Sequence, residues 1–330
     1  MLSSGSQSFL LETRAVSKRF NVGSRMVPAL GKTIHAVDRV SLQVVRGETL
    51  GIVGESGCGK STLGRCLVRL HDVSEGTILF EGKDITNLSR SGLRPLRRKI
   101  QMVFQDPAAS LNPRHRVREI VAEPLIIHGV DTHSGIDQRV AELLQVVGLN
   151  ADHLERFPHE FSGGQRQRIG IARAIALEPD LVIADEPVSA LDVSVQAQVV
   201  NLFQDLQERL GLTYIFIAHD LSVIRQVANR VAVMYLGSVV ETGPTEAVFN
   251  HPAHPYTQAL ISAVPVPDPN PIYRAKRIIL KGDVPNPATP PSGCRFHPRC
   301  AYVQTACRNE RPELKQNDSK REVACHFPLT

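Results

Sequence analysis

The sequence contains no tryptophan, and aromatic residues occupy only 5% of its 330 positions. It also lacks long hydrophobic runs, since no window approaches the ~18 apolar residues that a membrane-spanning helix requires. The N-terminus, MLSSGSQSFLLETR, does not show the basic and then apolar order of a secretory signal. We therefore expect a globular protein that has no membrane span and stays in the cytosol.

A large excess of charge is also absent, because the formal net charge is +5. This value permits contact with nucleic acid or an anionic membrane face, but a mildly basic surface explains it as well. The densest basic stretch, from Arg90 to Lys99, is short. We expect no nucleic-acid partner.

Proline and cysteine are concentrated at the C-terminal end. Thirteen of the 22 prolines lie in residues 251–330, a region that we expect to have little regular structure. The length predicts more than one domain. We place a first domain at residues 10–250, with a helical subdomain at about 106–176, and a Pro/Cys-rich extension at 251–330.

The stretch LGIVGESGCGKSTL, residues 50–63, is the strongest local signal. Its spacing is that of a P-loop, in which glycines let consecutive backbone N–H groups face a phosphate. A lysine adds positive charge, and a serine hydroxyl can ligate Mg²⁺. An apolar strand precedes this turn, and Leu63, Cys66, Leu67 and Leu70 predict a helix after it. The predicted nucleotide-binding residues are Gly54, Glu55, Ser56, Gly57, Cys58, Gly59, Lys60, Ser61 and Thr62.

A second signal is the apolar run LVIA (181–184), which ends in Asp185 and Glu186. Carboxylates at the end of a buried strand are costly unless they are paired or ligated, and α/β sheets place ligand chemistry at such ends. A glycine-containing turn, FSGGQ (161–165), precedes a predicted helix. Further strands at 100–104, 214–218 and 231–235 alternate with helices, which indicates a parallel sheet.

These motifs occur in the order GESGCGKST, Gln105, FSGGQ, LVIADEP, SALD and His219, and in this order they resemble the ATP-binding subunits of ABC transporters. The stretches VFQDPAASLNPR and DEPVSALDVSVQAQV, together with the C-terminal tail, are similar to the second ATPase subunit of dipeptide and oligopeptide importers. The resemblance covers residues 10–250. It implies an α/β P-loop NTPase of the ABC type, with a RecA-like core, an antiparallel β-subdomain and a helical subdomain.

The resemblance also implies roles for individual residues. Glu186 would be the general base for water, and His219 and Gln105 would complete the catalytic group. Mg²⁺ would be held by Ser61, Gln105 and Asp185, and Asp185 would also contact the nucleotide. Phe20 is placed like the aromatic residue that stacks on adenine, although it could equally be a strand core residue. Taken singly, Gln105, Glu186 and His219 also fit ordinary strand-end, surface or turn positions.

In this family the signature turn binds the nucleotide of the opposing subunit. The resemblance therefore implies contacts in trans from Ser162, Gly163, Gly164, Gln165 and Asp192. Phe161 stands where the family has leucine, an apolar exchange that should leave these contacts intact. No catalytic position is degenerate, so we expect this chain to hydrolyse ATP.

The last cysteines follow the spacing C-x5-C-x6-C-x17-C, at Cys294, Cys300, Cys307 and Cys325. Cysteine pairs two to four residues apart, which are usual in zinc sites, are missing from this set. Four thiolates at wider spacing can hold an iron–sulfur cluster, and the resemblance favours [4Fe–4S]. Zinc, with His297 or His326 as a substitute ligand, and unliganded or disulfide-bonded cysteines are the alternatives.

The implied function is the ATPase of an inner-membrane importer of di- or oligopeptides, a translocase peripheral to the cytoplasmic face. Expected partners are a second, homologous ATPase subunit in a heterodimer, two integral-membrane permeases, and a periplasmic or extracellular substrate-binding protein. The alternatives are a soluble ABC ATPase unrelated to transport, or an importer of nickel chelates, glutathione or opines.

Overall fold

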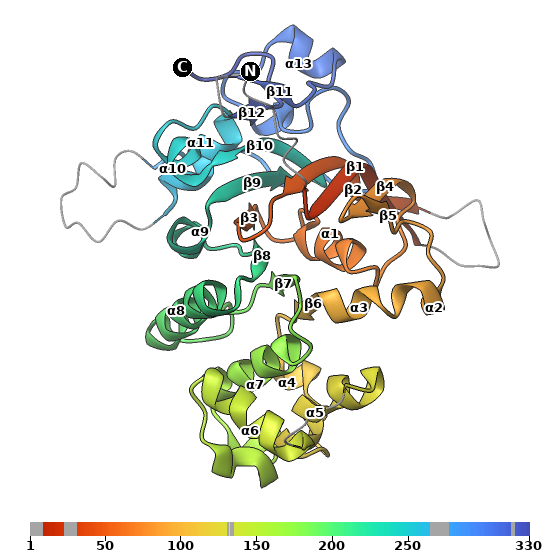
Figure 1. Ribbon diagram of the computed structural model, residues 1–330. Coiled ribbons are helices and arrows are strands. Elements are labelled where there is room, and N and C mark those ends of the chain that lie inside the picture. Colours follow the sequence, from red (N-terminus) through yellow and green to blue (C-terminus); the bar gives the residue numbers. More distant parts are fainter. Residues whose placement is uncertain (1–8, 23–31, 131, 133–134, 265–276, 318–320) are drawn as a thin grey trace, which may run out of the picture. The chain divides into compact units, whose positions relative to one another are not determined.

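The computed structural model describes residues 9–22, 32–130, 132, 135–264, 277–317 and 321–330. The chain divides into two compact units, which we call unit 1 and unit 2 (Figure 1). Unit 2 contains Arg46–Glu48 and Leu88–Ile217, and unit 1 contains the described residues of Met1–Val45, Thr49–Asn87 and Ala218–Thr330. Among the described residues, no helix is both long and apolar enough to cross a bilayer.

Unit 1 contains an antiparallel sheet with the strand order β2-β1-β4-β5. Strands β4 and β5 form a hairpin through a turn at Glu81 and Gly82. Both turn residues have positive φ, at 50° and 75°, as a tight two-residue hairpin requires. The strands are β1 (Leu11–Val22), β2 (Lys32–Val44), β4 (Glu75–Phe80) and β5 (Lys83–Asp84).

Unit 1 also contributes strands to a mixed sheet, in the order β11-β12-β10-β9-β3. Strand β3 is parallel to β9, whereas β10 returns antiparallel to β9. Helix α9 packs tightly on β3, since a Cβ at Gly51 would lie 2.6 Å from Cγ2 of Ile224. The elements are β3 (Thr49–Val53), α9 (Leu221–Val227), β9 (Arg230–Tyr235), β10 (Ser238–Pro244), β11 (Lys315–Gln316) and β12 (Glu322–Val323).

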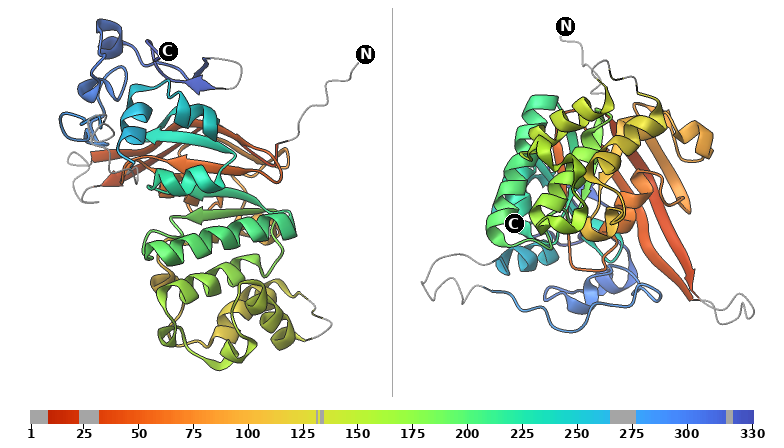
Figure 2. Two further views of the ribbon diagram at one scale, coloured as in Figure 1. Left: turned by 90° about the vertical axis from the view of Figure 1, so that its left-hand side faces the viewer. Right: turned by 90° about the horizontal axis from the view of Figure 1, so that it is seen from below.

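The described part of residues 251–330, which we call the C-terminal segment, lies against this mixed sheet, because β12 pairs with β10 (Figures 1 and 2). Its regular elements are short, as its proline content predicts. Helix α1 ends at Leu67, so the expected continuation to Leu70 is wrong, and the Leu70 side chain is exposed. The remaining helices of unit 1 are α1 (Lys60–Leu67), α10 (Thr245–Asn250), α11 (Pro255–Ser262), η4 (His297–Arg299) and α13 (Thr305–Asn309).

Unit 2 contains three parallel strands in the order β8-β7-β6. Every residue of β7 and β8 is buried, which explains their continuous apolar runs. Helix α8 covers these strands, and the ring of Phe203 lies edge-on to those of Tyr214 and Phe216, at 5.3 Å in each case. The elements are β6 (Ile100–Val103), β7 (Leu181–Asp185), β8 (Thr213–Ile217) and α8 (Val193–Leu210).

Among the other helices of unit 2, α5, α6 and α7 form the yellow and green group of Figure 1, whereas α2 and α3 are orange. Helix α6 ends at Val146, and Gly148 follows with a φ of 75°, as is common after a helix C-terminus. These helices are α2 (Arg90–Leu93), α3 (Leu96–Lys99), α4 (Pro107–Ser110), α5 (Val117–His128), α6 (Ile136–Val146), η2 (Ala151–Glu155), η3 (Pro158–Glu160) and α7 (Gly163–Ile175).

Candidate nucleotide site

The P-loop of unit 1 connects the buried strand β3 to the N-terminus of α1. Its glycines are required by the backbone: Gly54 has a φ of 153° and Gly59 a φ of 104°. A Cβ would lie 2.2 Å from the carbonyl oxygen of Met234 at Gly54, and 2.0 Å from that of Ala36 at Gly59. The loop therefore keeps its shape only with glycine at both positions.

The loop presents groups that suit a phosphate. Ser56 and Gly57 are exposed, Ser61 and Thr62 are half-buried, and α1 begins at Lys60. The side chain of Lys60 is buried, and its Nζ donates to the carbonyl oxygens of Gly54, at 2.8 Å, and Glu55, at 3.1 Å. The ammonium is thus held over the curl of the loop, where a nucleotide phosphate can accept from it.

Two further predicted residues belong to unit 1. Phe20 on β1 is half-buried rather than part of the core, and its ring lies edge-on to His71, with 5.6 Å between ring centres. His219 is exposed and follows Ala218, whose N–H donates to the carbonyl of Ile52 at 3.1 Å. The segment that carries His219 therefore runs beside the end of β3, where the P-loop begins.

In unit 2 the structure brings together two residues that the sequence separates widely. The Nε2 of Gln105 donates to Oε2 of Glu186 at 2.9 Å. Glu186 follows Asp185, whose side chain is completely buried at the carboxyl end of β7. Glu186 also has a φ of 46°, a left-handed conformation that is costly for a non-glycine residue and is concentrated at functional sites.

The glycine-containing turn forms the N-terminus of α7. Ser162 Oγ accepts from the N–H of Gln165, and Gln165 Oε1 accepts from the N–H of Ser162, which makes a capping box. Ser162 is exposed at the surface of unit 2. Gly164 is buried against α8, since a Cβ there would lie 2.3 Å from Cγ1 of Val195.

The SALD turn caps α8 next to this point. Asp192 Oδ1 accepts from the N–H of Val195 at 3.0 Å, and this hydrogen bond is the largest cause that lowers the pKa of Asp192. A Cβ at Gly163 would lie 3.4 Å from Leu191. The structure therefore places the residues predicted to act in trans side by side on unit 2, with Ser162 and Asp192 both exposed.

The four C-terminal cysteines converge on one small cavity of unit 1. Cys294 and Cys307 are adjacent in space, since the backbone N–H of Cys294 donates to the backbone carbonyl of Cys307 at 2.8 Å. Burial raises the pKa of Cys325 to about 11. Within the described residues, however, no three His, Cys, Asp or Glu side chains are arranged to hold a metal ion. The metal-binding prediction therefore lacks support from ligand geometry.

Sequence reasoning missed a set of arginines that attach the C-terminal segment to the rest of unit 1. Arg295 and Arg311 both form ion pairs with Asp38 on β2, and Arg311 also donates to Ser238 at 2.9 Å. Burial alone would raise the pKa of Asp38, but the two guanidiniums outweigh this effect and lower it. The repeated arginines around the cysteines in GCRFHPRC were the available signal.

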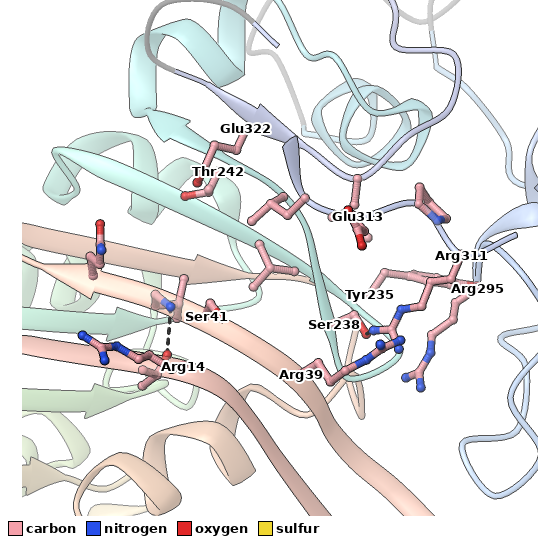
Figure 3. Close-up of a pocket in the computed structure, with 18 of the residues that line it drawn as sticks. Arg14, Arg39, Ser41, Tyr235, Ser238, Thr242, Arg295, Arg311, Glu313 and Glu322 are labelled. Carbon is pink, nitrogen blue, oxygen red and sulfur yellow. Dashed lines mark hydrogen bonds between the residues drawn. The ribbon is translucent and has the colours of Figure 1, made fainter. Parts of the chain in front are cut away.

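These arginines border a cavity of about 560 Å³ (Figure 3). Arg39, Arg295 and Arg311 lie close to Ser238 and Tyr235 in this view, whereas Glu322 and Thr242 lie farther along the cavity. The carboxylates of Glu12, Glu313 and Glu322 also belong to the lining, so the cavity carries both signs of charge.

Comparison with known proteins assigns both parts of the sequence. Residues 37–189 match the family model described as ABC transporter, and residues 240–307 match the C-terminal region of oligopeptide/dipeptide transporters. The chain is 52% identical to the oligopeptide transport ATP-binding protein AppF of Bacillus subtilis (strain 168), with 99% of each covered. It is 50% identical to the probable peptide ABC transporter ATP-binding protein y4tS of Sinorhizobium fredii, covering 96% of this chain and 89% of the relative.

Solved structures share the fold. The dimeric, post-hydrolysis structure of the ATP-binding cassette MJ0796 with ADP and Pi has a TM-score of 0.64 and 30% identity, and the match covers 71% of this chain and 98% of that one. The structure of cbiO1 from Clostridium perfringens, part of the ABC transporter complex cbiONQ, has a TM-score of 0.62 and 29% identity, covering 74% and 91%. The expected ABC-type P-loop fold is therefore confirmed.

Proposed function

The chain belongs to the ATP-binding subunits of oligopeptide and dipeptide ABC transporters, and we propose that its ATP hydrolysis drives peptide import through separate permease subunits. One geometric observation supports the ATP hydrolysis most directly: Gln105 donates to Glu186 at the end of β7. An ATPase needs a carboxylate held in a defined orientation toward water, and this contact provides one.

We propose the residue roles that the family resemblance implies. Lys60 and the P-loop amides bind the β- and γ-phosphates, while Phe20 stacks on adenine. Glu186 accepts a proton from the attacking water, and His219 positions that water against the γ-phosphate. The oxygen donors Ser61, Gln105 and Asp185 suit Mg²⁺, which supplies neutralisation of phosphate charge when it is bound. Catalysis then consists mainly of positioning and charge stabilisation.

The signature turn acts on a second ATPase subunit. Ser162 is exposed, and Gly163 and Gln165 are half-buried, at an α-helix N-terminus, a position that favours an anion. Together with Asp192 they contact the nucleotide held by the opposing subunit. We infer a heterodimer with a homologous ATPase, which closes when ATP binds and docks on two permeases at the cytoplasmic face of the membrane.

The proposal includes a domain organisation. We assign residues 10–250 to the ATPase domain, with a helical subdomain at about 106–176, and residues 251–330 to the Pro/Cys-rich extension. The family match over residues 37–189 lies within the first part, and the match over residues 240–307 lies largely in the second. The substrate-binding protein selects the peptide outside the membrane. Nickel chelates, glutathione and opines are the competing cargoes, and an ATPase unconnected with transport is the alternative from another functional class.

Purification of the full transporter tests the proposal. The tagged chain should co-purify with two permeases and a second ATPase. After reconstitution into lipid vesicles, the complex should import peptide only when ATP is present inside the vesicles, on the side that corresponds to the cytosol. Recovery of the chain alone, or of soluble partners alone, would contradict it. Competition of labelled peptide uptake by glutathione or nickel chelates would reassign the cargo.

We further propose that the four C-terminal cysteines hold a [4Fe–4S] cluster. All four line one cavity. In such a cluster each thiolate binds a different iron, so the thiols lie farther apart than around a single zinc ion. This difference is compatible with the lack of a single-ion geometry among the described residues. Metal ligation would stabilise a segment that has little regular structure.

Anaerobic purification tests the cluster. The protein should be coloured, with iron and sulfide in equal amounts close to four per chain. Colour and iron should be lost when Cys307 is replaced by serine, while Cys66→Ser retains them. Colourless protein with one zinc per chain would reassign the site, and protein free of metal would refute any metal role.

A further inference from the structure

Glu55, the second residue of the P-loop, is held at all of its polar groups. Its N–H donates to the hydroxyl of Tyr256 at 2.9 Å. Its carbonyl oxygen accepts from Lys60 Nζ at 3.1 Å and from the N–H of Cys58 at 3.2 Å. Its carboxylate accepts two hydrogen bonds from Arg299, at 2.8 and 3.2 Å. Tyr256 and Arg299 both lie in the C-terminal part of the chain.

Arg299 is a rigid partner for this carboxylate. Its side chain is only 9% exposed, and its guanidinium lies 6.0 Å from the ring centre of Tyr235. It belongs to the 3₁₀ turn His297–Arg299, and its N–H donates to the carbonyl of Phe296 at 3.0 Å. The position of the guanidinium is therefore set by the fold of the C-terminal segment.

An aromatic cluster supports this turn. Phe296 is buried and packs against Tyr235 and Tyr256, with ring centres 5.2 and 5.4 Å apart. Tyr235 and Tyr256 pack on each other at 4.7 Å. The same cluster thus fixes both groups that hold Glu55, namely the Tyr256 hydroxyl and the Arg299 guanidinium. A change in the packing of the segment would be transmitted to the P-loop.

The ion pair also has an electrostatic consequence. Glu55 places a negative charge in a loop whose task is to bind phosphates, and that charge by itself repels a nucleotide. The Arg299 guanidinium donates two hydrogen bonds to the Glu55 carboxylate, and its positive charge neutralises the negative charge of Glu55. The pair is only partly open to water, since the Glu55 side chain is 26% exposed, so solvent screens it weakly.

We propose that Arg299 is a positioning residue for nucleotide binding: from the cysteine-containing C-terminal segment it orients and neutralises Glu55, and so sets the affinity of the P-loop. This role does not depend on a metal at the cysteines, because every contact that carries it is made by protein groups. It also holds whatever cargo the transporter carries.

Binding of Mg–ADP to the full chain, measured by calorimetry, tests the proposal. Arg299→Gln should weaken binding about tenfold, the equivalent of 1.4 kcal/mol. In a Glu55→Gln background, where no charge remains to be neutralised, the same substitution should weaken binding by less than about threefold. Arg308→Gln, an exposed arginine of the same segment, is the matched control and should bind as the unaltered chain does.

A second variant keeps the test decisive if Arg299→Gln folds poorly. Arg299→Lys retains the charge but loses the double hydrogen bond, so its affinity should lie within about threefold of the unaltered chain. Equal weakening by Arg299→Gln in the two Glu55 backgrounds would overturn the proposal. So would unchanged affinity in a folded Arg299→Gln protein, or a lysine variant that binds as weakly as the glutamine variant.

Discussion

The amide of Gln105 donates a hydrogen bond to the carboxylate of Glu186, with 2.9 Å between Nε2 and Oε2. The backbone of Glu186 is held as well, since its N–H donates to the carbonyl of Ile217 and its carbonyl accepts from Ser189 Oγ. The left-handed conformation at Glu186 thus persists because neighbouring groups hold it. The carboxylate consequently points in one direction, which is what a general base requires.

Glu186→Gln should abolish turnover and preserve ATP binding. The amide is nearly isosteric with the carboxylate but cannot accept the proton of water, so we expect the steady-state ATPase rate of the assembled transporter to fall about 10²–10⁴-fold. The variant should retain unhydrolysed ATP. Glu178→Gln, which changes an exposed carboxylate in unit 2, is the control. Normal turnover by Glu186→Gln would contradict the assigned role.

Ser162→Arg should impair the site that belongs to the partner ATPase. The bulky side chain would occupy the surface at the start of α7, where the opposing nucleotide is expected to bind. Hydrolysis can be assigned by combining this variant with an inactive P-loop on one subunit or the other. Loss should appear only when the partner's P-loop is the active one. Ser91→Arg, another exposed serine of unit 2, should leave both sites active.

Acid should destabilise unit 1 through His254. Complete burial lowers the pKa of His254 from the ordinary 6.5 to about 3. Between these two pKa values only the unfolded chain takes up the proton. The contribution of neutral His254 to the free energy of unfolding is therefore fully present above pH 6.5 and is lost as the pH falls. The free energy of unfolding should decrease by about 1.4 kcal/mol per pH unit below 6.5.

His254→Asn isolates this contribution. His254 Nδ1 accepts from the N–H of Tyr256 at 3.0 Å and caps α11, a role that asparagine can take over. Glu241 accepts from the N–H of His254, and burial raises its pKa. It therefore changes the free energy of unfolding with pH in the direction opposite to His254, and it does so in both proteins. Urea unfolding from pH 5 to 7 should show a shallower loss in the variant, and identical slopes would disprove the assignment.

Asp38→Asn should loosen the C-terminal segment. The carboxylate is only 11% exposed and pairs with two guanidiniums, so its removal leaves positive charge buried without compensation. We expect a loss of about 3 kcal/mol in the free energy of unfolding. Asp72→Asn affects an ion pair whose carboxylate is 89% exposed, and should cost less than about 1 kcal/mol. Equal losses of stability from the two substitutions would contradict the role of Asp38 in holding the C-terminal segment.

The sequence by itself determined the P-loop, the order of the motifs and the type of fold. These features are local: glycine spacing dictates a curled backbone, continuous apolar runs dictate buried strands, and caps such as Ser162 and Asp192 begin helices. The helix expected to reach Leu70 shows the limit of such reasoning, since periodicity does not say where a helix ends.

Only the tertiary structure decided which distant residues meet. Gln105 and Glu186 are 81 positions apart, and Glu55 and Arg299 are 244 apart. Each contact depends on strand order or on how the C-terminal segment packs, and no local pattern encodes either. A buried guanidinium needs a carboxylate, but composition alone does not select which one. Packing of the aromatic cluster beneath Arg299 made that selection.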